Sequence, residues 1–201
     1  MLFRSTGSGV DVNETTALSA GAVKQAVRLL SQTMGMLPLH VYERVGTRDK
    51  QKQRAPGHPL YQVLHSRPNP EQTRMEFMSM MVGNHVMRGN AVAEIVRDAG
   101  GRVRELWPIP SHCVRMERDR QTRARTYWVN VRGEEKKLRA DQVLHVPNFT
   151  MDGVWGRGLL DDAPEAIGTM IAAERSGANL DRKSTRLNSS HSQQSRMPSS
   201  A

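Results

Sequence analysis

The spacing of hydrophobic side chains changes near Asn90, and this change constrains the fold more than any other feature of the sequence. Before Asn90, apart from an alternating stretch at 37–44, apolar residues recur every three or four positions, as on one face of an α-helix. After Asn90 they alternate with polar residues, as in half-buried strands. A helical pattern returns after residue 161. Helices followed by antiparallel strands and a further helix indicate an α+β fold. The 201 residues are enough for one core, with room for a small second lobe.

Four helices are predicted. The first is amphipathic, with Thr15 or Thr16 as its cap and Gly35 at its end. Prolines bracket a short second helix, and five methionines in the third are interpreted as adaptable core filling. Asp161 and Asp162 precede Pro164 and indicate the start of the fourth. The predicted ranges are 17–34, 60–64, 71–87 and a helix from about 161 whose apolar face holds Ile167, Met170, Ile171 and Ala173.

The predicted strands alternate apolar and polar side chains. Asp98-Ala-Gly-Gly101 contains residues that tolerate positive φ, so the strands on either side of it are expected to form a hairpin. Residues 46–55 are polar and are interpreted as a solvated turn. The predicted strands are 37–44, with Leu37, Leu39 and Val41 on one face, then 91–97, 102–107, 114–117, 126–131 and 143–146.

The two ends of the chain differ in composition from the middle. Residues 1–16 are polar and rich in Gly, Ser and Thr, and are expected to form a flexible N-terminal arm. Residues 182–201 hold seven Ser and no acid, so we expect disorder there. Their sequence also resembles translated sequencing-adapter DNA, which predicts a non-native tail; a natural disordered tail is the alternative. The folded region is therefore expected over 17–181.

Composition excludes several classes of protein. Cys113 is the single cysteine, so no intrachain disulfide or CxxC metal site is possible. No stretch of 18 apolar residues and no signal-peptide pattern occur, which predicts a soluble, unexported chain without membrane contact. The formal charge is +9, of which the tail carries +4. The remaining +5 is too mild to argue for nucleic-acid binding by itself.

Few residues of the sequence form a pattern that is typical of a catalytic or metal site. The histidines are scattered, and His145 is interpreted as a hydrogen-bonded strand residue. Cys113 is interpreted as a small apolar residue beside Val114. The Gly-rich segment 153–158 lacks the spacing of a phosphate-binding loop and is interpreted as a tight turn. No catalytic, cofactor-binding or metal residue is therefore assigned, no cofactor is expected, and the protein is not predicted to be an enzyme.

Two alternatives remain open at this point. Asp119, Glu134 and Lys136 have the residue types of a magnesium-dependent nuclease, although they lie at polar turn ends. A small basic nucleic-acid-binding protein is the other alternative. It rests on the densest basic stretch, with aromatics directly after it: Arg115, Arg118, Arg120, Arg123, Arg125, Tyr127 and Trp128.

Four segments, taken in order, resemble the amino-terminal half of the portal proteins of tailed double-stranded-DNA bacteriophages. The resemblance covers about residues 17–180. It departs from the family at Val92, where an aromatic is common, at Gly158-Leu159, and in length, since family members are roughly twice as long. The segments are Gly35-Met-Leu-Pro-Leu-His-Val-Tyr-Glu43; His58-Pro-Leu-Tyr-Gln-Val-Leu-His65 with Pro68-Asn-Pro70; Gly89-Asn-Ala-Val-Ala-Glu-Ile95 continuing to Leu106-Trp-Pro-Ile-Pro110; and Val143-Leu-His-Val146 with Asp152-Gly153.

This resemblance implies a structural subunit of a ring, usually of twelve copies, at one vertex of the capsid. DNA is packaged and ejected through such a ring, whose partners are the terminase large subunit, the capsid and head-completion proteins. The resemblance further implies a wing-like α+β region that ends before most of the stem and clip. It also implies production in the bacterial cytoplasm and a final location in the virion.

Overall fold

The computed structural model describes residues 6–45 and 51–194, with side chains described as far as Leu180. The described residues form two compact units, one of residues 6–24 with 163–194 and the other of residues 25–45 with 51–162. The helices are α1 (Glu14–Ala17), α2 (Gly21–Met36), α3 (Pro59–His65), α4 (Arg74–Arg88), α5 (Leu159–Asp162) and α6 (Pro164–Gln194), with 3₁₀ turns η1 (Ser111–Cys113) and η2 (Ala140–Gln142). The strands are β1 (Tyr42–Val45), β2 (Gln51–Arg54), β3 (Asn90–Arg97), β4 (Val103–Ile109), β5 (Val114–Arg118), β6 (Arg125–Val131), β7 (Glu134–Arg139) and β8 (Val143–Pro147).

The first unit joins the N-terminal segment to α6. Asn13 caps α1, since its side-chain oxygen accepts a hydrogen bond from the Thr16 amide at 3.0 Å. The Glu165 carboxylate accepts one from the Gly7 amide at 3.0 Å, and Glu174 accepts one from Gly21 at 3.1 Å. Over residues 6–16 the structure therefore differs from the predicted flexible arm. The small polar side chains form turn and capping hydrogen bonds instead of staying solvated.

Helix α6 continues to Gln194, across residues predicted to be disordered. No Gly or Pro occurs between Asp181 and Gln194, so nothing in that stretch breaks the backbone pattern. For residues 182–194 the structure describes the backbone alone. The native or non-native origin of this segment remains a prediction.

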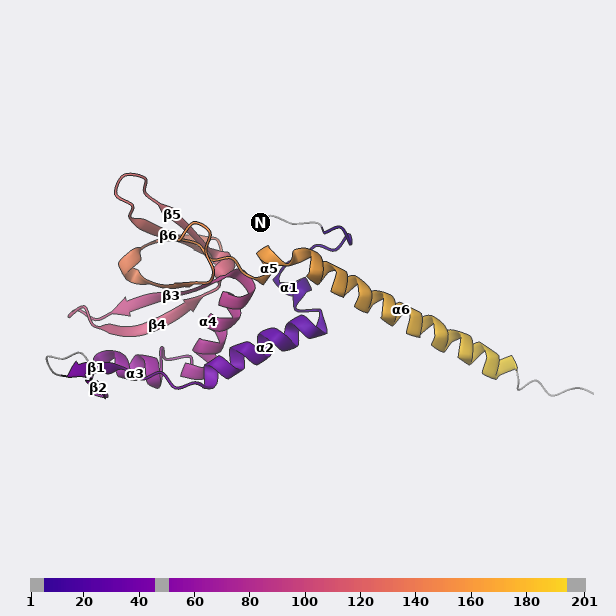
Figure 1. Cartoon of the computed structure of the whole chain (residues 1–201), viewed down its shortest axis with the longest axis horizontal. Coiled ribbons are helices and arrows are strands. Elements are labelled where there is room, and N and C mark those ends of the chain that lie inside the picture. The colour runs from indigo at the N-terminus through magenta and orange to yellow at the C-terminus, as the bar shows by residue number, and fades with distance from the viewer. Residues whose placement is uncertain (1–5, 46–50, 195–201) are drawn as a thin grey trace, which may run out of the picture. The chain divides into compact units, whose positions relative to one another are not determined.

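The second unit contains two three-stranded antiparallel sheets, with strand orders β4-β3-β8 and β5-β6-β7. The β3–β4 and β5–β6 hairpins are recognisable in Figure 1. Strand β3 is the centre of its sheet, and its first four residues are buried. It therefore faces protein on both sides, not on one side as simple alternation predicts.

Two hydrophobic cores lie on opposite faces of β3. Val92, which is fully buried, packs with β5–β7 side chains such as Tyr127 and Leu138. Its neighbours Ala91 and Ala93 pack instead with Phe77 and other side chains of α3 and α4. The small alanine side chains suit the close approach of helices to the sheet. Position 92 is thus a core position between two sheets.

The α+β prediction is confirmed, and most predicted elements are present. The helix predicted over 17–34 is divided, since α1 ends at Ala17 and α2 runs from Gly21 through Gly35 to Met36; the cap of α1 is Asn13 and not Thr15 or Thr16. The helix predicted over 71–87 begins after Thr73, which caps it together with Glu76, and ends at Gly89 with φ of +75°. Of the five methionines, Met81 and Met87 are buried, as expected for core filling, whereas Met75 is exposed. The hairpin, the strands after Val114 and the short helix at Pro59 are also present.

One strand prediction is wrong in part, and one strand was not predicted. Residues 37–41 are not a strand, and β1 begins only at Tyr42, with all four of its residues exposed. Leu37 is 52% exposed, so the alternation there does not mark a buried face. Strand β7 was not predicted, because five of its six side chains are polar and exposed, and only Leu138 is buried. Of the turn predicted over 46–55, residues 51–54 form β2 and residues 46–50 lie outside the described residues.

Candidate functional site

The residues proposed for a nuclease do not come together. Asp119 follows β5 beside the Arg118–Arg125 pair, whereas Glu134 pairs with Val131 at the other end of β6. Six residues of β6 separate these positions, about 20 Å at the usual rise of a strand. Lys136 instead contacts Glu94 of β3, with 2.6 Å between Nζ and Oε1. The nuclease hypothesis is wrong on geometry.

Asp119 has a structural role at the tip of the β5–β6 hairpin. Its Oδ1 accepts hydrogen bonds from the amides of Gln121 at 2.9 Å and Thr122 at 2.7 Å. These bonds from the Thr122 and Gln121 amides lower the pKa of the Asp119 carboxyl. The carboxylate therefore closes the turn.

The aromatic residues after the basic stretch point to opposite faces, as the alternation predicts. Tyr127 is 2% exposed and belongs to the core. Trp128 lies on the other face, between the charged ends of Arg115 and Lys137, which are 5.8 and 5.2 Å from the ring centroid. Its indole N–H donates to Glu117 at 2.9 Å. Tyr127 is thus unavailable for stacking on a base.

Other candidate sites are also accounted for. Cys113 packs against the core that contains Val114, as predicted. Within residues 6–45 and 51–194, no three His, Cys, Asp or Glu side chains gather in a way that could hold a metal ion. Nor does any helix in the described part of the chain have the length and apolar character needed to cross a membrane.

The most constrained site in the structure is a crossing of three glycine backbones. A Cβ placed on Gly89 would lie 2.3 Å from the Arg157 carbonyl carbon, and one on Gly156 would lie 1.9 Å from the Gly89 oxygen. A Cβ on Gly158 would lie 2.3 Å from the Gly89 nitrogen. We call this crossing, with Asn90, the glycine joint. It explains the Gly-rich turn at 153–158, which must pass directly over the end of α4.

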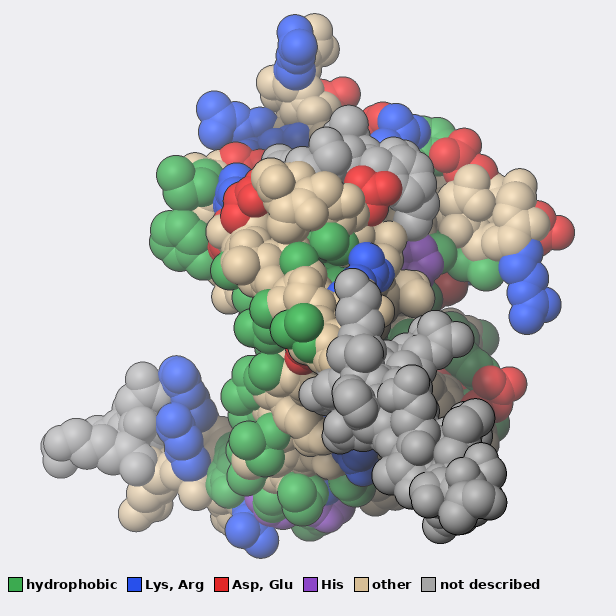
Figure 2. Space-filling view, turned by 90° about the vertical axis from the view of Figure 1, so that its right-hand side faces the viewer, with side chains coloured by type: hydrophobic (Ala, Val, Ile, Leu, Met, Phe, Trp, Pro, Cys, Tyr) green, Lys and Arg blue, Asp and Glu red, His purple; other side chains and the backbone are tan. Residues whose placement is uncertain are grey.

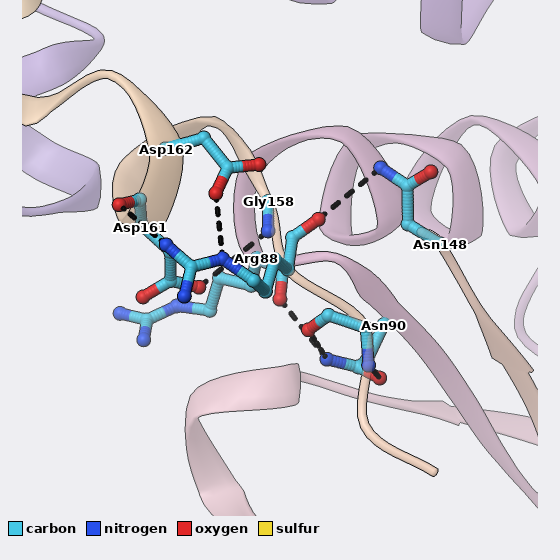
Figure 3. Close-up of polar contacts among 8 residues, drawn as sticks. Arg88, Asn90, Asn148, Gly158, Asp161 and Asp162 are labelled. Carbon is cyan, nitrogen blue, oxygen red and sulfur yellow. Dashed lines mark hydrogen bonds and ion pairs between the residues drawn. The ribbon is translucent and has the colours of Figure 1, made fainter. Parts of the chain in front are cut away.

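Asn90 occupies the centre of the glycine joint and is fully buried. Its Nδ2 donates to the carbonyls of Gly156 at 2.8 Å and Arg88 at 3.0 Å. Its Oδ1 accepts from the Gly156 amide at 2.9 Å, and the hydroxyl of Ser111 donates to its backbone carbonyl. Figure 3 shows Asn90 and Arg88 beside the loop that leads to Gly158. One side chain thus joins the ends of α4 and β3 to the loop.

His145 extends this network to the second sheet. Because the Asn90 Oδ1 is an acceptor, the His145 Nε2, 2.9 Å away, carries the proton. The His145 Nδ1 then accepts from the Tyr127 hydroxyl at 3.1 Å. Burial, and secondarily Arg125, lowers the pKa of His145 to about 4. The imidazole is therefore neutral near pH 7, and the prediction of a hydrogen-bonded strand histidine is confirmed.

The loop after the glycine joint is held by Arg157. Its Nε donates to Asp162 Oδ1 at 2.7 Å, and its backbone carbonyl accepts from the Asn148 side chain at 3.3 Å. Gly158 donates to Asp161 Oδ2 at 3.5 Å. These contacts close the polypeptide between β8 and α5 into a fixed turn.

An apolar surface is the second notable feature of the larger unit. Helix α2 and the residue after it expose large apolar side chains, which are Leu29 (68%), Leu30 (49%), Met34 (44%), Met36 (59%) and Leu37 (52%). We call these residues the α2 apolar face. Met34 also lines a groove of about 340 Å³ with side chains of α4 and β8, among them Phe77 and Leu144. Hydrophobic side chains are accordingly exposed in the lower half of Figure 2, at the level of α2 in Figure 1.

The end of α2 is fixed to α4 by Arg74. Its guanidinium donates to the carbonyls of Gly35 at 3.0 Å and Met36 at 3.4 Å, and also to that of Leu37 at 2.5 Å. These carbonyls have no partner within the helix, so the guanidinium acts as a C-terminal cap. Arg74 therefore positions the α2 apolar face.

The segments that carry the resemblance to portal proteins contact one another. His65 of the second segment shares a hydrogen bond of 2.9 Å with the Leu39 carbonyl of the first. Asn69 donates to the Leu106 carbonyl at 2.9 Å, and Leu106 donates to the Pro68 carbonyl at 2.7 Å. Gly89-Asn90 and His145 meet at the glycine joint, as described above. The resemblance thus covers the contacts that hold the second unit together.

Comparison with protein families decides the assignment. The family model described as "Phage portal protein" matches residues 21–195. The chain belongs to the phage portal protein family. Among curated relatives, the portal-family chain is 36% identical to protein BeeE of Escherichia coli K12 over 113 residues, covering 56% of the chain and 69% of BeeE. It is 26% identical to the portal protein of Enterobacteria phage HK97 over 163 residues, covering 81% and 38%.

Solved structures share the fold of the portal-family chain. A chain in the neck of an empty gene transfer agent particle superposes with a TM-score of 0.71 at 22% identity, over 83% of this chain and 44% of that one. A crystal structure of an HK97-family phage portal protein from Corynebacterium diphtheriae gives 0.57 at 21% identity, over 89% and 51%. The portal-family chain spans about two fifths of the HK97 relative and about half of these structures.

Sequence reasoning did not find Asn90 or Arg74 as central residues. Asn90 directly follows a glycine at the end of a helix pattern, a signal that also fits an ordinary turn. The interaction of Arg74 with α2 depends on the packing of two helices 39 residues apart in sequence. No local pattern contains that information.

Proposed function

We propose that this chain is the amino-terminal part of a structural subunit of a phage portal ring. The single observation that carries the proposal is the family match over residues 21–195. In this proposal the ring lies at one capsid vertex of the virion, and double-stranded DNA enters and leaves through it. The full-length subunit would be made in the host cytoplasm, and its role is that of a conduit without catalytic activity.

The symmetry of related particles supports a ring of identical subunits. One similar structure is the neck of a native gene transfer agent particle computed with twelvefold symmetry, with a TM-score of 0.61. The proposed partners are other copies of the chain, the terminase large subunit, the capsid and head-completion proteins. Residues that follow the matched region in longer relatives would supply most of the stem and clip.

The α2 apolar face is the proposed contribution of this region to ring closure. A cyclic ring closes through heterologous contacts, in which one patch meets a different patch of the neighbour. Helix α4 uses Phe77, Met81 and Met87 in its own core, whereas the α2 apolar face leaves Leu29 and Met36 more than half exposed. Exposed apolar side chains contiguous with a groove are typical of protein contacts.

Resequencing of the gene is the first test of the proposal. Resequencing across codons 175–205 should reveal a reading frame that continues with native sequence in place of residues 182–201, which we propose are not native. The extended product should form rings visible by electron microscopy. An extended product that remains monomeric would contradict the proposal.

A matched pair of variants tests the ring contact. Leu29→Ser with Met36→Ser should abolish ring formation by the extended product. Phe149→Ser with Met151→Ser removes two side chains of comparable exposure, 69% and 78%, from a loop and should leave the rings intact. Equal effects of both pairs would exclude the α2 apolar face as the ring contact.

A further inference from the structure

The tip of the β5–β6 hairpin carries a dense positive charge. Residues 118–125 hold four arginines and one aspartate, a net charge of +3 over eight residues. Arg118, Arg120 and Arg123 are exposed and Arg125 is half-buried. Among the described residues, ion pairs of the basic side chains of this sheet involve Arg115, Lys136 and Arg139, and none of the four tip arginines.

The one acid at the tip is already occupied. The Asp119 carboxylate accepts the Gln121 and Thr122 amides, and the Asp119 amide donates to the Ala124 carbonyl at 2.9 Å. These bonds fix the loop without using a guanidinium. The tip is therefore a closed turn whose single acid pairs with backbone amides and not with the arginines. Outside the tip, the pKa of Asp152 is lowered mainly by the Trp155 and Val154 amides and in smaller part by Arg118, so this arginine has one acidic neighbour.

The arrangement of the arginines is unfavourable for stability. Arg118 and Arg125 are directly opposite each other in the β5–β6 ladder, where like charges repel. Arg123 has φ of +56°, the left-handed region in which Gly or Asn is lower in energy than arginine. Four arginines are held together here although their arrangement lowers the stability of the fold. This indicates a surface that binds an anion.

The hairpin tip extends beyond its sheet as a two-stranded ribbon. The β6–β7 ladder ends at the Thr126–Arg139 pair, so residues 118–125 have no third strand beside them. Figure 1 shows this hairpin projecting at the top of the second unit, and Figure 2 shows Lys and Arg side chains at the same height. A ribbon of two strands matches the width of the major groove of B-DNA, with phosphates on both flanks.

We infer that the tip of the β5–β6 hairpin, residues 118–125, binds the phosphate backbone of double-stranded DNA without reading its sequence. Arginine binds phosphate oxygens through two parallel N–H groups, and four such contacts carry no base specificity. Tyr127 is buried, so base stacking has no part in the interaction. The binding is a property of this chain alone, so it does not depend on ring assembly.

The test measures affinity for a fluorescent 20-bp duplex as a function of salt, using the 201-residue chain. Four phosphate contacts predict a fall of roughly 100-fold in affinity between 50 and 200 mM salt. The hairpin variant Arg118→Gln, Arg120→Gln, Arg123→Gln, Arg125→Gln should bind at least about tenfold more weakly at 100 mM salt, with a salt slope reduced by about 3.6.

The control variant removes the same charge elsewhere. Four exposed arginines of the second unit make no described ion pair, and replacing them with Gln gives the same net charge as the hairpin variant: Arg54, Arg67, Arg102 and Arg104. The control should retain most of the affinity. Equal losses in both variants, with both folded by circular dichroism, would overturn the inference, because binding would then depend on net charge alone.

A competition experiment distinguishes DNA from an acidic protein surface. Unlabelled duplex should displace the probe at a lower charge concentration than polyglutamate. If polyglutamate displaces it equally well, the tip recognises acidic side chains rather than phosphate, and the assignment to DNA is wrong.

Discussion

Replacing Gly89 with alanine tests whether the glycine joint depends on close backbone approach. Gly89 has φ of +75°, and a Cβ there would lie within 2.6 Å of three backbone atoms of Gly156 and Arg157. Gly101 provides the matched control, because its φ is +78° and a Cβ there would meet nothing within 4 Å. Both variants incur the cost of a left-handed alanine, whereas only Gly89→Ala also forces the loop to move.

The two costs have different sizes. A left-handed alanine costs about 1 kcal/mol, which is the whole expected effect of Gly101→Ala. Displacing a packed backbone adds about 2–3 kcal/mol, by analogy with overpacked cores. The free energy of unfolding should therefore fall by about 3–4 kcal/mol in Gly89→Ala. With a urea slope of about 2 kcal/mol/M, the midpoints of the two variants should differ by more than about 1 M.

Tryptophan fluorescence during urea unfolding is the suitable assay. The three tryptophans, Trp107, Trp128 and Trp155, all belong to the second unit, so the signal reports the unit that contains the joint. An equal loss of stability in Gly89→Ala and Gly101→Ala would refute the reasoning. It would mean that the left-handed backbone conformation, and not the contact with Gly156 and Arg157, explains why position 89 requires glycine.

Three further predictions concern single side chains. The pKa of His145 is lowered from 6.5 to about 4, so the neutral imidazole stabilises the fold above pH 6.5, and this contribution is lost as the pH falls towards 4. The wild type should lose about 1–2 kcal/mol more than His145→Gln between pH 7 and 4.5, measured by urea midpoints; parallel pH profiles would contradict this. Arg74→Met should speed amide hydrogen exchange at the end of α2 at least about tenfold, whereas Arg104→Met should not. Thr73→Ala removes the cap of α4 and should destabilise the second unit by about 1 kcal/mol, a loss absent in Thr122→Ser.

Local patterns predicted the elements whose burial follows one simple period. Helix α4 has a capping box at Thr73 and Glu76 and a glycine at its end, and the β3–β4 hairpin has a Gly-Gly turn. The predictions failed where exposed side chains depart from the simple pattern of buried and exposed positions. Alternation over 37–41 resembles a strand, but Arg74 binds the carbonyls of Met36 and Leu37, and the described β1–β2 ladder begins only at Tyr42. Strand β7 is held by its ladder to β6, and a single buried leucine leaves almost no hydrophobic signal.

For the candidate sites too, features set by local sequence were predictable, and features set by tertiary pairing were not. The closed turn at 153–158 and the buried His145 were predictable, because glycine spacing and a flanking apolar strand are local features. The separation of Asp119 from Glu134 was not, since it depends on which end of β6 each residue meets. Asn90 looks like a turn residue in sequence and becomes the centre of a network only when the loop 66 residues later returns to it.

The outer edge of β4 restricts one way in which copies of this protein could associate. At Leu106 the amide and carbonyl are both taken by Pro68 and Asn69, and two residues further on Pro108 has no N–H to offer. At the opposite edge of the same sheet, β8 ends in Pro147. A neighbouring chain therefore has little opportunity to extend this sheet by adding a strand, a common route to aggregation. At this sheet, a contact between copies must therefore be made by side chains, which can separate without breaking a strand ladder.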